Sequence, residues 1–412
     1  MLNNQNLDKE QKVFLEILSS SVHQTNLSDI SLNIEEWNRV LSLARIHNVV
    51  SLVFEKASEI SAFTKLPTYT QNMMETMTSV ATQARRTEAF LALYQKCLQE
   101  DIHPIVMKGI ICRQLYGEYC DHRPSGDEDI LIRKEYYPLI QKIFIENGYF
   151  PENANITPKQ LEELQEITFH NIQTGLAIEV HVNPIGHHNN LRRKMNDYFM
   201  DVFERSVVLN INDINITTMS ATDHYLYLVL HSFKHFTSAG FGIRQVLDIL
   251  LFEQEYVDEI DWVYVERVLK DIRAYSFMAD LAYIGKQYLG FKSQLSRSEN
   301  CPEDLLADLL GNGIFGNGTQ EQRTALQMTN AAVAGNKRSR ADTILRTIFP
   351  SKSQMLNSHP ELQEKPWLLP ICWVKRWGRF LAHNKANGGN LAAESMKISK
   401  RRIELLKKYD IL

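Results

Sequence analysis

Three acids stand side by side at the start of a short apolar run. They are Asp127, Glu128 and Asp129, and residues 130–132 that follow them are Ile-Leu-Ile. Successive side chains of a strand point to opposite faces, so we expect Asp127 and Asp129 on one side and Glu128 on the other. Two carboxylates on the same side can bind divalent cations, and Mg²⁺ usually combines one or two carboxylates with substrate phosphates. Because the apolar residues anchor the strand, we expect the acids at its solvent-facing end, an arrangement suited to two-metal phosphoryl or nucleotidyl transfer.

A D-x-D pattern is common in solvated surface turns, but two other segments favour a site here. Lys108 and Gly109 end a short apolar run and open a helix, where backbone N–H groups can bind phosphate oxygens. One helix connects this turn to Asp127. Residues 176–182, Leu-Ala-Ile-Glu-Val-His-Val, form a second apolar strand that carries Glu179 on the face opposite to its isoleucine and valine neighbours.

Three histidines are further candidates for the same site. His181 lies two residues after Glu179 on the same strand face, where it could orient the acid or contact a phosphate. His231 and His235 are four residues apart and share a helix face. That spacing suits a metal, but no Glu accompanies it as in the H-E-x-x-H motif, so a polar helix face and a role in nucleotide or acceptor binding both stay open. The same alternatives apply to three charged residues of these helices: Lys234, Arg244 and Asp248.

The order of these motifs resembles the DNA polymerase β-like nucleotidyltransferase superfamily, in which a glycine turn, a helix, a D-x-D strand and a later acid follow one another. More narrowly, MKGIICRQLYGEYCDHRPSGDEDILI and IEVHVNP are similar to the pattern of an uncharacterised bacterial nucleotidyltransferase family. The resemblance continues into DHYLYLVLHSFKHF and IRQVLDILL and covers roughly residues 30–290. It implies an α+β fold, with a polymerase β-like core of a small mixed sheet and helices between N-terminal and C-terminal helical regions.

Carried over residue by residue, the resemblance makes Asp127, Asp129 and Glu179 both the catalytic acids and the metal ligands. Glu179 would also orient or deprotonate the acceptor hydroxyl, and Gly109 would open the phosphate-facing turn. The implied nucleotide-binding set is Lys108, Gly109, Arg123, Ser125, Gly126, His181, His231 and His235. The lysine and arginine of this set could neutralise triphosphate oxygens. The implied cofactor is Mg²⁺ or Mn²⁺.

The chain departs from the family's pattern at two positions. The superfamily turn is commonly Gly followed by Gly or Ser, whereas Ile110 follows Gly109 here, and Glu179 stands in place of an Asp. The expected function is Mg-dependent transfer of a nucleoside monophosphate group from an NTP to an unidentified small-molecule or protein acceptor. The alternative is a catalytically inactive nucleotide-binding or partner-binding protein on the same scaffold.

The elements that must position these residues fall into three blocks. Residues 1–100 have helical spacing and predict an N-terminal helical region. Residues 101–220 are rich in short apolar and alternating runs and predict the nucleotidyltransferase α/β core, with a hairpin turn near Asn212-Asp213. Residues 221–412 predict a C-terminal helical region, whose first helix has a cap signal at Thr222-Asp223.

Composition and charge exclude several classes of protein. The chain has 412 residues, is 44% hydrophobic and 23% charged, and has a formal net charge of −4. This is an ordinary globular composition, and the mild charge argues against a partner made of long nucleic acid. The apolar runs are too short for a membrane helix, and the N-terminus lacks a signal-peptide apolar region. Five dispersed cysteines without C-x-x-C indicate reduced thiols. We therefore expect a soluble cytoplasmic protein without a membrane partner.

Overall fold

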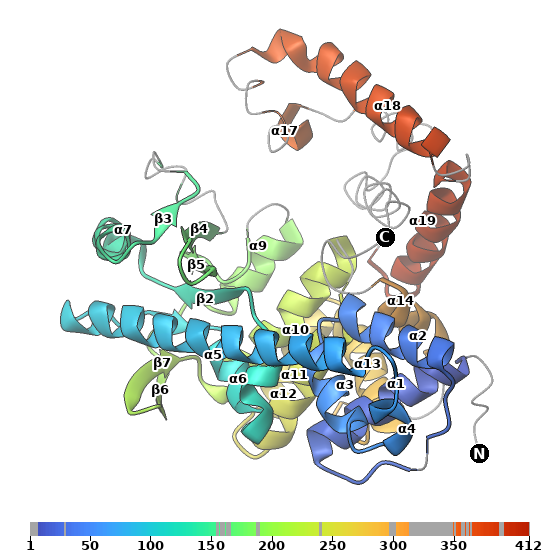
Figure 1. Cartoon of the computed structure of the whole chain (residues 1–412). Helices are drawn as coiled ribbons and strands as arrows, with labels where there is room; N and C mark the ends of the chain where they lie inside the picture. Colours follow the sequence, from blue (N-terminus) through green and yellow to red (C-terminus); the bar gives the residue numbers. More distant parts are fainter. Residues whose placement is uncertain are drawn as a thin grey trace. The chain divides into compact units, whose positions relative to one another are not determined.

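The computed structural model shows a chain of two compact units (Figure 1). The first comprises Met1–Lys234 and Gly242–Glu303, and the second comprises His235–Phe241 and Asp304–Leu412. The residues that the structure describes are 7–28, 30–153, 156, 161, 166–186, 190–238, 241–295, 302–312, 349, 352–355, 359, 362, 365–386 and 391–411.

Among these residues, seven strands form one mixed sheet in the first unit. They are β1 (Ile105–Val106), β2 (Asp127–Leu131), β3 (Phe150–Pro151), β4 (Glu166–Asn171), β5 (Leu176–His181), β6 (Val207–Ile211) and β7 (Ile214–Thr218). Their spatial order is β3-β4-β5-β2-β1-β7-β6. β2 pairs in parallel with β5, and β1 pairs in parallel with β7, whereas the other pairs are antiparallel. The expected mixture of helices and a mixed sheet is confirmed, and the polymerase β-like core stays a prediction.

One face of the sheet packs into the hydrophobic core of the first unit. The apolar residues of β2, β4 and β5 that point to this face form one buried cluster with side chains of α5 (Tyr69–Gln99) and α7 (Tyr137–Glu146). In Figure 1 the long helix α5 runs along the sheet. The alternation of β5 follows from this packing, because Ile178 and Val180 are buried in the cluster while Glu179 points to the other face.

The first unit contains further helices besides α5 and α7. They are α1 (Lys9–His23), α2 (Ile34–Ile46), α3 (Val50–Ala57), α4 (Ser61–Thr64), α6 (Ile110–Gln114), η1 (Gly117–His122), η2 (Lys134–Tyr136), α9 (Asn190–Asp197), α11 (Ile243–Glu255), α12 (Trp262–Asp271) and α13 (Tyr275–Tyr288). The first two helices, α1 and α2, start at side-chain caps, since Asp8 and Asn33 each accept a hydrogen bond from the backbone three residues later.

The second unit is helical in the residues described. Its elements are α14 (Glu303–Asn312), α17 (Lys352–Met355), η4 (Pro366–Leu368), α18 (Leu369–Ala386) and α19 (Leu391–Lys408). Arg402 links three of its segments, because it pairs with Asp308 at 2.6 Å and donates a hydrogen bond to the Phe236 carbonyl at 2.6 Å. The division into 1–100, 101–220 and 221–412 stays a prediction, although α5 ends at Gln99 and β7 ends at Thr218.

The turn between β6 and β7 follows the sequence pattern, while the start of α10 (Ala221–Ser238) does not. Asn212 and Asp213 both have positive φ, at 50° and 63°, as a two-residue hairpin turn requires. The cap predicted at Thr222-Asp223 is wrong, because Ser220 accepts the hydrogen bond of the Asp223 N–H at 3.3 Å. Asp223 instead pairs with Arg205 at 2.8 Å, which leaves the serine hydroxyl as the cap.

The acids of β2 do not lie at a solvent-facing strand end as the sequence suggested. Glu128 is fully buried and Asp129 is 1% exposed. Glu128 points to the apolar face of the sheet, where Arg113 of α6 pairs with it at 2.5 Å. Its other oxygen accepts the Ile110 N–H at 2.8 Å. The expectation is wrong because α6 folds back over the end of β2 and supplies a buried counterion for the middle acid.

Gly109 permits this close approach between the turn and Glu128. It has φ 56° and ψ −113°, a combination open mainly to glycine. A Cβ atom added there would lie 1.8 Å from the Glu128 carboxylate oxygen. The Ile110 N–H, which is the first backbone donor of α6, therefore donates its hydrogen bond to a carboxylate of the protein itself.

We predict that Gly109→Ala destabilises the fold by about 2 kcal/mol or more, because it combines backbone strain with a clash against a buried ion pair. Gly126→Ala is the matched control, since an added Cβ there would meet nothing within 4 Å. The control should change the free energy of unfolding by no more than ~0.5 kcal/mol. Chemical denaturation of both variants measures this, and equal stabilities would contradict the role assigned to Gly109.

Candidate active site

The parallel register of β2 and β5 brings two of the predicted acids together. Asp129 lies directly beside Glu179, and Asp127 lies beside Ala177. Side chains at paired positions of adjacent strands point to the same face of the sheet, opposite to the core. His181 follows on the same face. The carboxylate and imidazole atoms of Asp129, Glu179 and His181 lie within 4.8 Å of one another, so we call these three residues the acid–histidine cluster.

Asp127 shares this face but is not part of the closest group. Its carboxylate accepts a hydrogen bond from the Ser125 hydroxyl at 3.3 Å, and the same hydroxyl lies 2.7 Å from the Asp127 carbonyl oxygen. Asp127 is half-buried, whereas Asp129 is buried. The sequence grouped Asp127, Asp129 and Glu179 as ligands, while the structure puts His181 nearest to the latter two.

A lysine and an imidazole compensate the buried carboxylates. Lys108 Nζ lies 2.8 Å from Asp129 Oδ1 and 3.4 Å from His231 Nε2. His181 Nε2 lies 3.3 Å from Asp129 Oδ1 and 3.6 Å from Glu179 Oε2. Burial by itself would raise the pKa of Asp129, but Lys108 and His181 hold it well below its usual range.

The protonation of the other two cluster residues follows from the same neighbours. Burial alone would lower the pKa of His181, but hydrogen bonds to Asp129 and Glu179 raise it to about 9. His181 is therefore an imidazolium at neutral pH. Burial raises the pKa of Glu179, the His181 hydrogen bond opposes this effect, and the charge of Asp129 adds to it. A carboxylate with a raised pKa is better suited to accept a proton than an ordinary surface acid.

Two predicted nucleotide-binding residues have partners that the sequence did not indicate. Arg123 is 4% exposed and forms a bidentate ion pair with Asp248 of α11, with nitrogen–oxygen distances of 2.7 Å and 2.6 Å. Tyr116 donates a further hydrogen bond to Asp248 at 2.9 Å. The Ile110 N–H that follows Gly109 already binds Glu128. Contacts of Arg123 or Gly109 with a nucleotide stay predictions.

The two histidines of α10 belong to different compact units. His231 joins the site through its contact with Lys108. His235 lies one turn further along α10, in the short segment that belongs to the second compact unit. Lys234, the last residue of this part of the first unit, is largely buried, and burial lowers its pKa to about 8.

Tyr227 is a site residue that the sequence did not reveal. Its side chain is fully buried, and its hydroxyl has no hydrogen-bond partner among the described residues. Its ring lies 5.6 Å from that of His231, and its pKa is raised by burial and by the charges of Asp129 and Glu179, with Lys108 opposing them. A tyrosine within an apolar helix pattern reads as core, so only its place four residues before His231 linked it to the candidate helix face.

The acid–histidine cluster is compatible with a divalent cation. Carboxylate oxygens suit Mg²⁺ and Mn²⁺, and an imidazole nitrogen suits the softer of these ions. Lys108 and the His181 proton now supply the positive charge that a cation would bring. For His181 to act as a ligand it must first lose its proton, because an imidazolium has no free lone pair.

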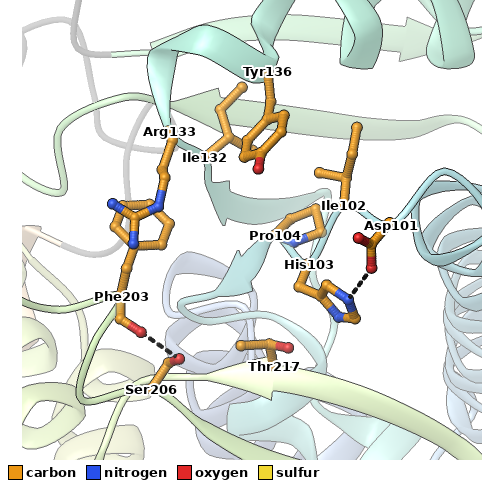
Figure 2. A pocket seen from close by; sticks show the side chains of 10 residues that line it. All are labelled: Asp101, Ile102, His103, Pro104, Ile132, Arg133, Tyr136, Phe203, Ser206 and Thr217. Carbon is orange, nitrogen blue, oxygen red and sulfur yellow. Dashed lines mark hydrogen bonds and ion pairs between the residues drawn. The ribbon is translucent and has the colours of Figure 1, made fainter.

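Figure 2 shows a pocket of the first unit that is lined by other residues. It has a volume of about 220 Å³ and sits where β1 begins and β2 ends. Arg133 stacks over the Phe203 ring at 4.4 Å on one side, and the Asp101–His103 ion pair lies on another. It shares no residue with the acid–histidine cluster.

Comparison with known protein families gives the class of this protein. The model of an uncharacterised nucleotidyltransferase family matches residues 33–290. This match covers more than half of the chain, so the protein belongs to that family of nucleotidyltransferases. No curated protein and no solved structure matches the chain. Within the described residues, none of the helices has the length and apolar character that crossing a membrane requires.

We predict that His181 titrates with a pKa of about 9 in the metal-free protein. Because this folded value lies above the ordinary 6.5, the proton stabilises the fold fully below about pH 6.5, and this stabilisation is lost as the pH rises through about 9. NMR of histidine-labelled protein should show a clearly lower pKa in Asp129→Asn. Glu146→Gln, which changes an exposed acid of α7, should leave the pKa unchanged. An ordinary His181 pKa in the wild type would contradict the cluster geometry.

Proposed function

We propose that this protein is a divalent-metal-dependent nucleotidyltransferase, which moves a nucleoside monophosphate group from an NTP to a small-molecule or protein acceptor. The observation that carries the proposal is the pairing of Asp129 and Glu179 on adjacent parallel strands, with Asp127 on the same face. Membership of the nucleotidyltransferase family supports the reaction class. The expected cation is Mg²⁺ or Mn²⁺, with Asp127, Asp129 and Glu179 as its ligands and His181 as a neighbour.

The proposed reaction forms one bond and breaks one. The acceptor hydroxyl oxygen attacks the α-phosphorus, the bond from that phosphorus to the pyrophosphate oxygen breaks, and pyrophosphate leaves. The bound cation would polarise the α-phosphate and stabilise the leaving group. Glu179 accepts the acceptor's proton, which its raised pKa favours. Lys108 donates to phosphate oxygens once it leaves Asp129, and His181 holds Asp129 and Glu179 in place.

The alternative is an inactive nucleotide-binding or partner-binding protein on the same scaffold. One observation favours it: the glycine turn that would bind phosphates already binds Glu128 through the Ile110 N–H. The ion pair between Lys108 and Asp129 also competes with a metal at Asp129. Retention of Asp127, Asp129 and Glu179 on one face opposes this alternative, because an inactive scaffold has no need for three acids there.

A labelling experiment tests the proposal. The protein is incubated with Mg²⁺ or Mn²⁺, α-³²P-labelled NTPs and a cell extract, and products that retain the label are separated. Wild type should form a labelled product that Asp129→Asn does not form, because this change removes a charged ligand. Glu179→Gln should slow product formation by ~10²–10⁴-fold, as expected for loss of a general base. Glu146→Gln should behave as the wild type.

A second measurement separates the two functions. NTP with Mn²⁺ should raise the unfolding temperature of the wild type, because a ligand that binds the native state stabilises it. A thermal shift without any labelled product, in extracts that contain a range of acceptors, would favour the inactive nucleotide-binding protein. Labelled product at equal rates in the wild type and Asp129→Asn would rule out the proposed site.

A further inference from the structure

The segment Arg123–Gly126, which leads into Asp127, is held by side chains from distant parts of the chain. Arg86 of α5 donates to the Ser125 carbonyl at 3.1 Å, and Gln83 of α5 accepts the Ser125 N–H at 2.7 Å. Arg244 of α11 donates to the Pro124 carbonyl. Two arginines from separate helices therefore converge on the backbone immediately before the acid strand.

The side chains around this segment have more hydrogen-bond donors than the neighbouring acceptors can satisfy. Four buried nitrogen atoms have no hydrogen-bond partner among the described residues: Gln83 Nε2, Arg86 Nε, Arg123 Nη1 and Arg244 Nε. Gln83 is 1% exposed and Arg123 is 4% exposed, so water does not freely satisfy them. Buried donors without acceptors are rare in folded proteins and call for a partner. All four belong to residues that hold or form one four-residue segment, so a single ligand rich in acceptors would satisfy several of them.

The local charge is also unbalanced. Arg123 pairs with Asp248, but neither Arg86 nor Arg244 forms an ion pair in the described part of the chain. Burial lowers the pKa of both, with repulsion from Arg85 at Arg86 and from Arg123 at Arg244. The charge of Asp127, which belongs to the predicted metal site, acts on both guanidinium groups, and Asp248 also acts on Arg244.

Space is available beside this segment. A Cβ atom added at Gly126 would meet nothing within 4 Å, and Gly126 is exposed. The contrast with Gly109 is direct, because there the same added atom would meet Glu128 at 1.8 Å. The first N–H of the glycine turn is already bound to Glu128, whereas Gly126, beside the donor-rich segment before Asp127, is exposed and has room next to it.

We propose that Arg86, Arg244 and the Nη1 atom of Arg123 bind the phosphate chain of the NTP substrate, with Gln83 as a neutral donor. The inference rests on the proposed function and assigns the phosphate contacts to the Asp127 side of the strand instead of the Gly109 turn. Guanidinium groups bind phosphate oxygens in pairs of hydrogen bonds, which gives them an advantage over point charges at such a site. A triphosphate carries more negative charge and extends further than a single phosphate, so it can contact donors from separate helices at the same time.

Isothermal titration calorimetry with inorganic tripolyphosphate tests this site without metal and without turnover. The wild type should bind tripolyphosphate more tightly than orthophosphate. Arg86→Gln and Arg244→Gln should each weaken tripolyphosphate binding by about tenfold or more, since each removes charge-assisted hydrogen bonds. Arg133→Gln is the matched control, because Arg133 is an exposed arginine that pairs with Glu204. Thermal unfolding checks that each variant is folded, and Arg86→Lys and Arg244→Lys, which keep the charge, should recover part of the affinity.

The outcomes separate this inference from the proposed function. The phosphate site is supported if the wild type binds tripolyphosphate, if both glutamine variants lose this binding, and if NTP displaces the bound tripolyphosphate. This conclusion holds even if no transfer product is ever found. Three results would each overturn the phosphate site. The wild type does not bind tripolyphosphate, both glutamine variants bind it as tightly as the wild type, or NTP does not displace it. If transfer activity depends on Asp129 but not on Arg86 or Arg244, the phosphate site is likewise wrong, while the proposed function stays intact.

Discussion

The parallel pairing of β2 with β5 is the constraint on which the candidate site depends. It places Asp129 beside Glu179 and leaves Ile178 and Val180 in the core with the apolar residues of β2. A shift of one residue would bury Glu179 and expose its apolar neighbours, so the hydrophobic core protects the register that the acids need. Parallel strands also require a long connection, which α7, β3 and β4 provide between them.

Burial of the acids makes charge compensation the second organising feature. Glu128 pairs with Arg113 on the core face, and Asp129 pairs with Lys108 and His181 on the other face. An unpaired charge in such surroundings would cost several kcal/mol, so each buried acid needs its own cation. The two faces of β2 therefore serve different purposes: one ion pair fixes the turn at Gly109, and the other holds the acid–histidine cluster ready for a ligand.

The distribution of free donors complements this arrangement. Donors of the glycine turn and of Arg123 are largely used inside the protein, by Glu128 and Asp248 respectively. Arg86 and Arg244 each donate one hydrogen bond to a backbone carbonyl, of Ser125 and Pro124 respectively, but the Nε atom of each has no partner among the described residues. The charge of the half-buried Asp127 acts on both. The first N–H of the glycine turn is thus occupied, whereas donors around the segment before Asp127 have no partner among the described residues, which gives a physical basis for choosing where an anionic substrate would bind.

The sequence alone determined what depends on local periodicity and on motif order. Alternation placed Asp127 and Asp129 on one side of a strand and Glu179 opposite its apolar neighbours, helical spacing identified the long helices, and motif order indicated the nucleotidyltransferase family. These results hold because strand and helix periods are properties of a few consecutive residues.

Only the tertiary structure decided which distant side chains meet. The ion pair of Arg123 with Asp248 joins residues 125 positions apart, and the burial of Glu128 depends on how α6 folds back over β2. For the same reason Arg86 and Tyr227 appeared in the sequence as ordinary helix residues, although Arg86 holds the segment before Asp127 and Tyr227 lies beside His231. Helix packing sets these contacts through the shapes of many side chains together, and no pattern within one segment records which partner another segment will supply.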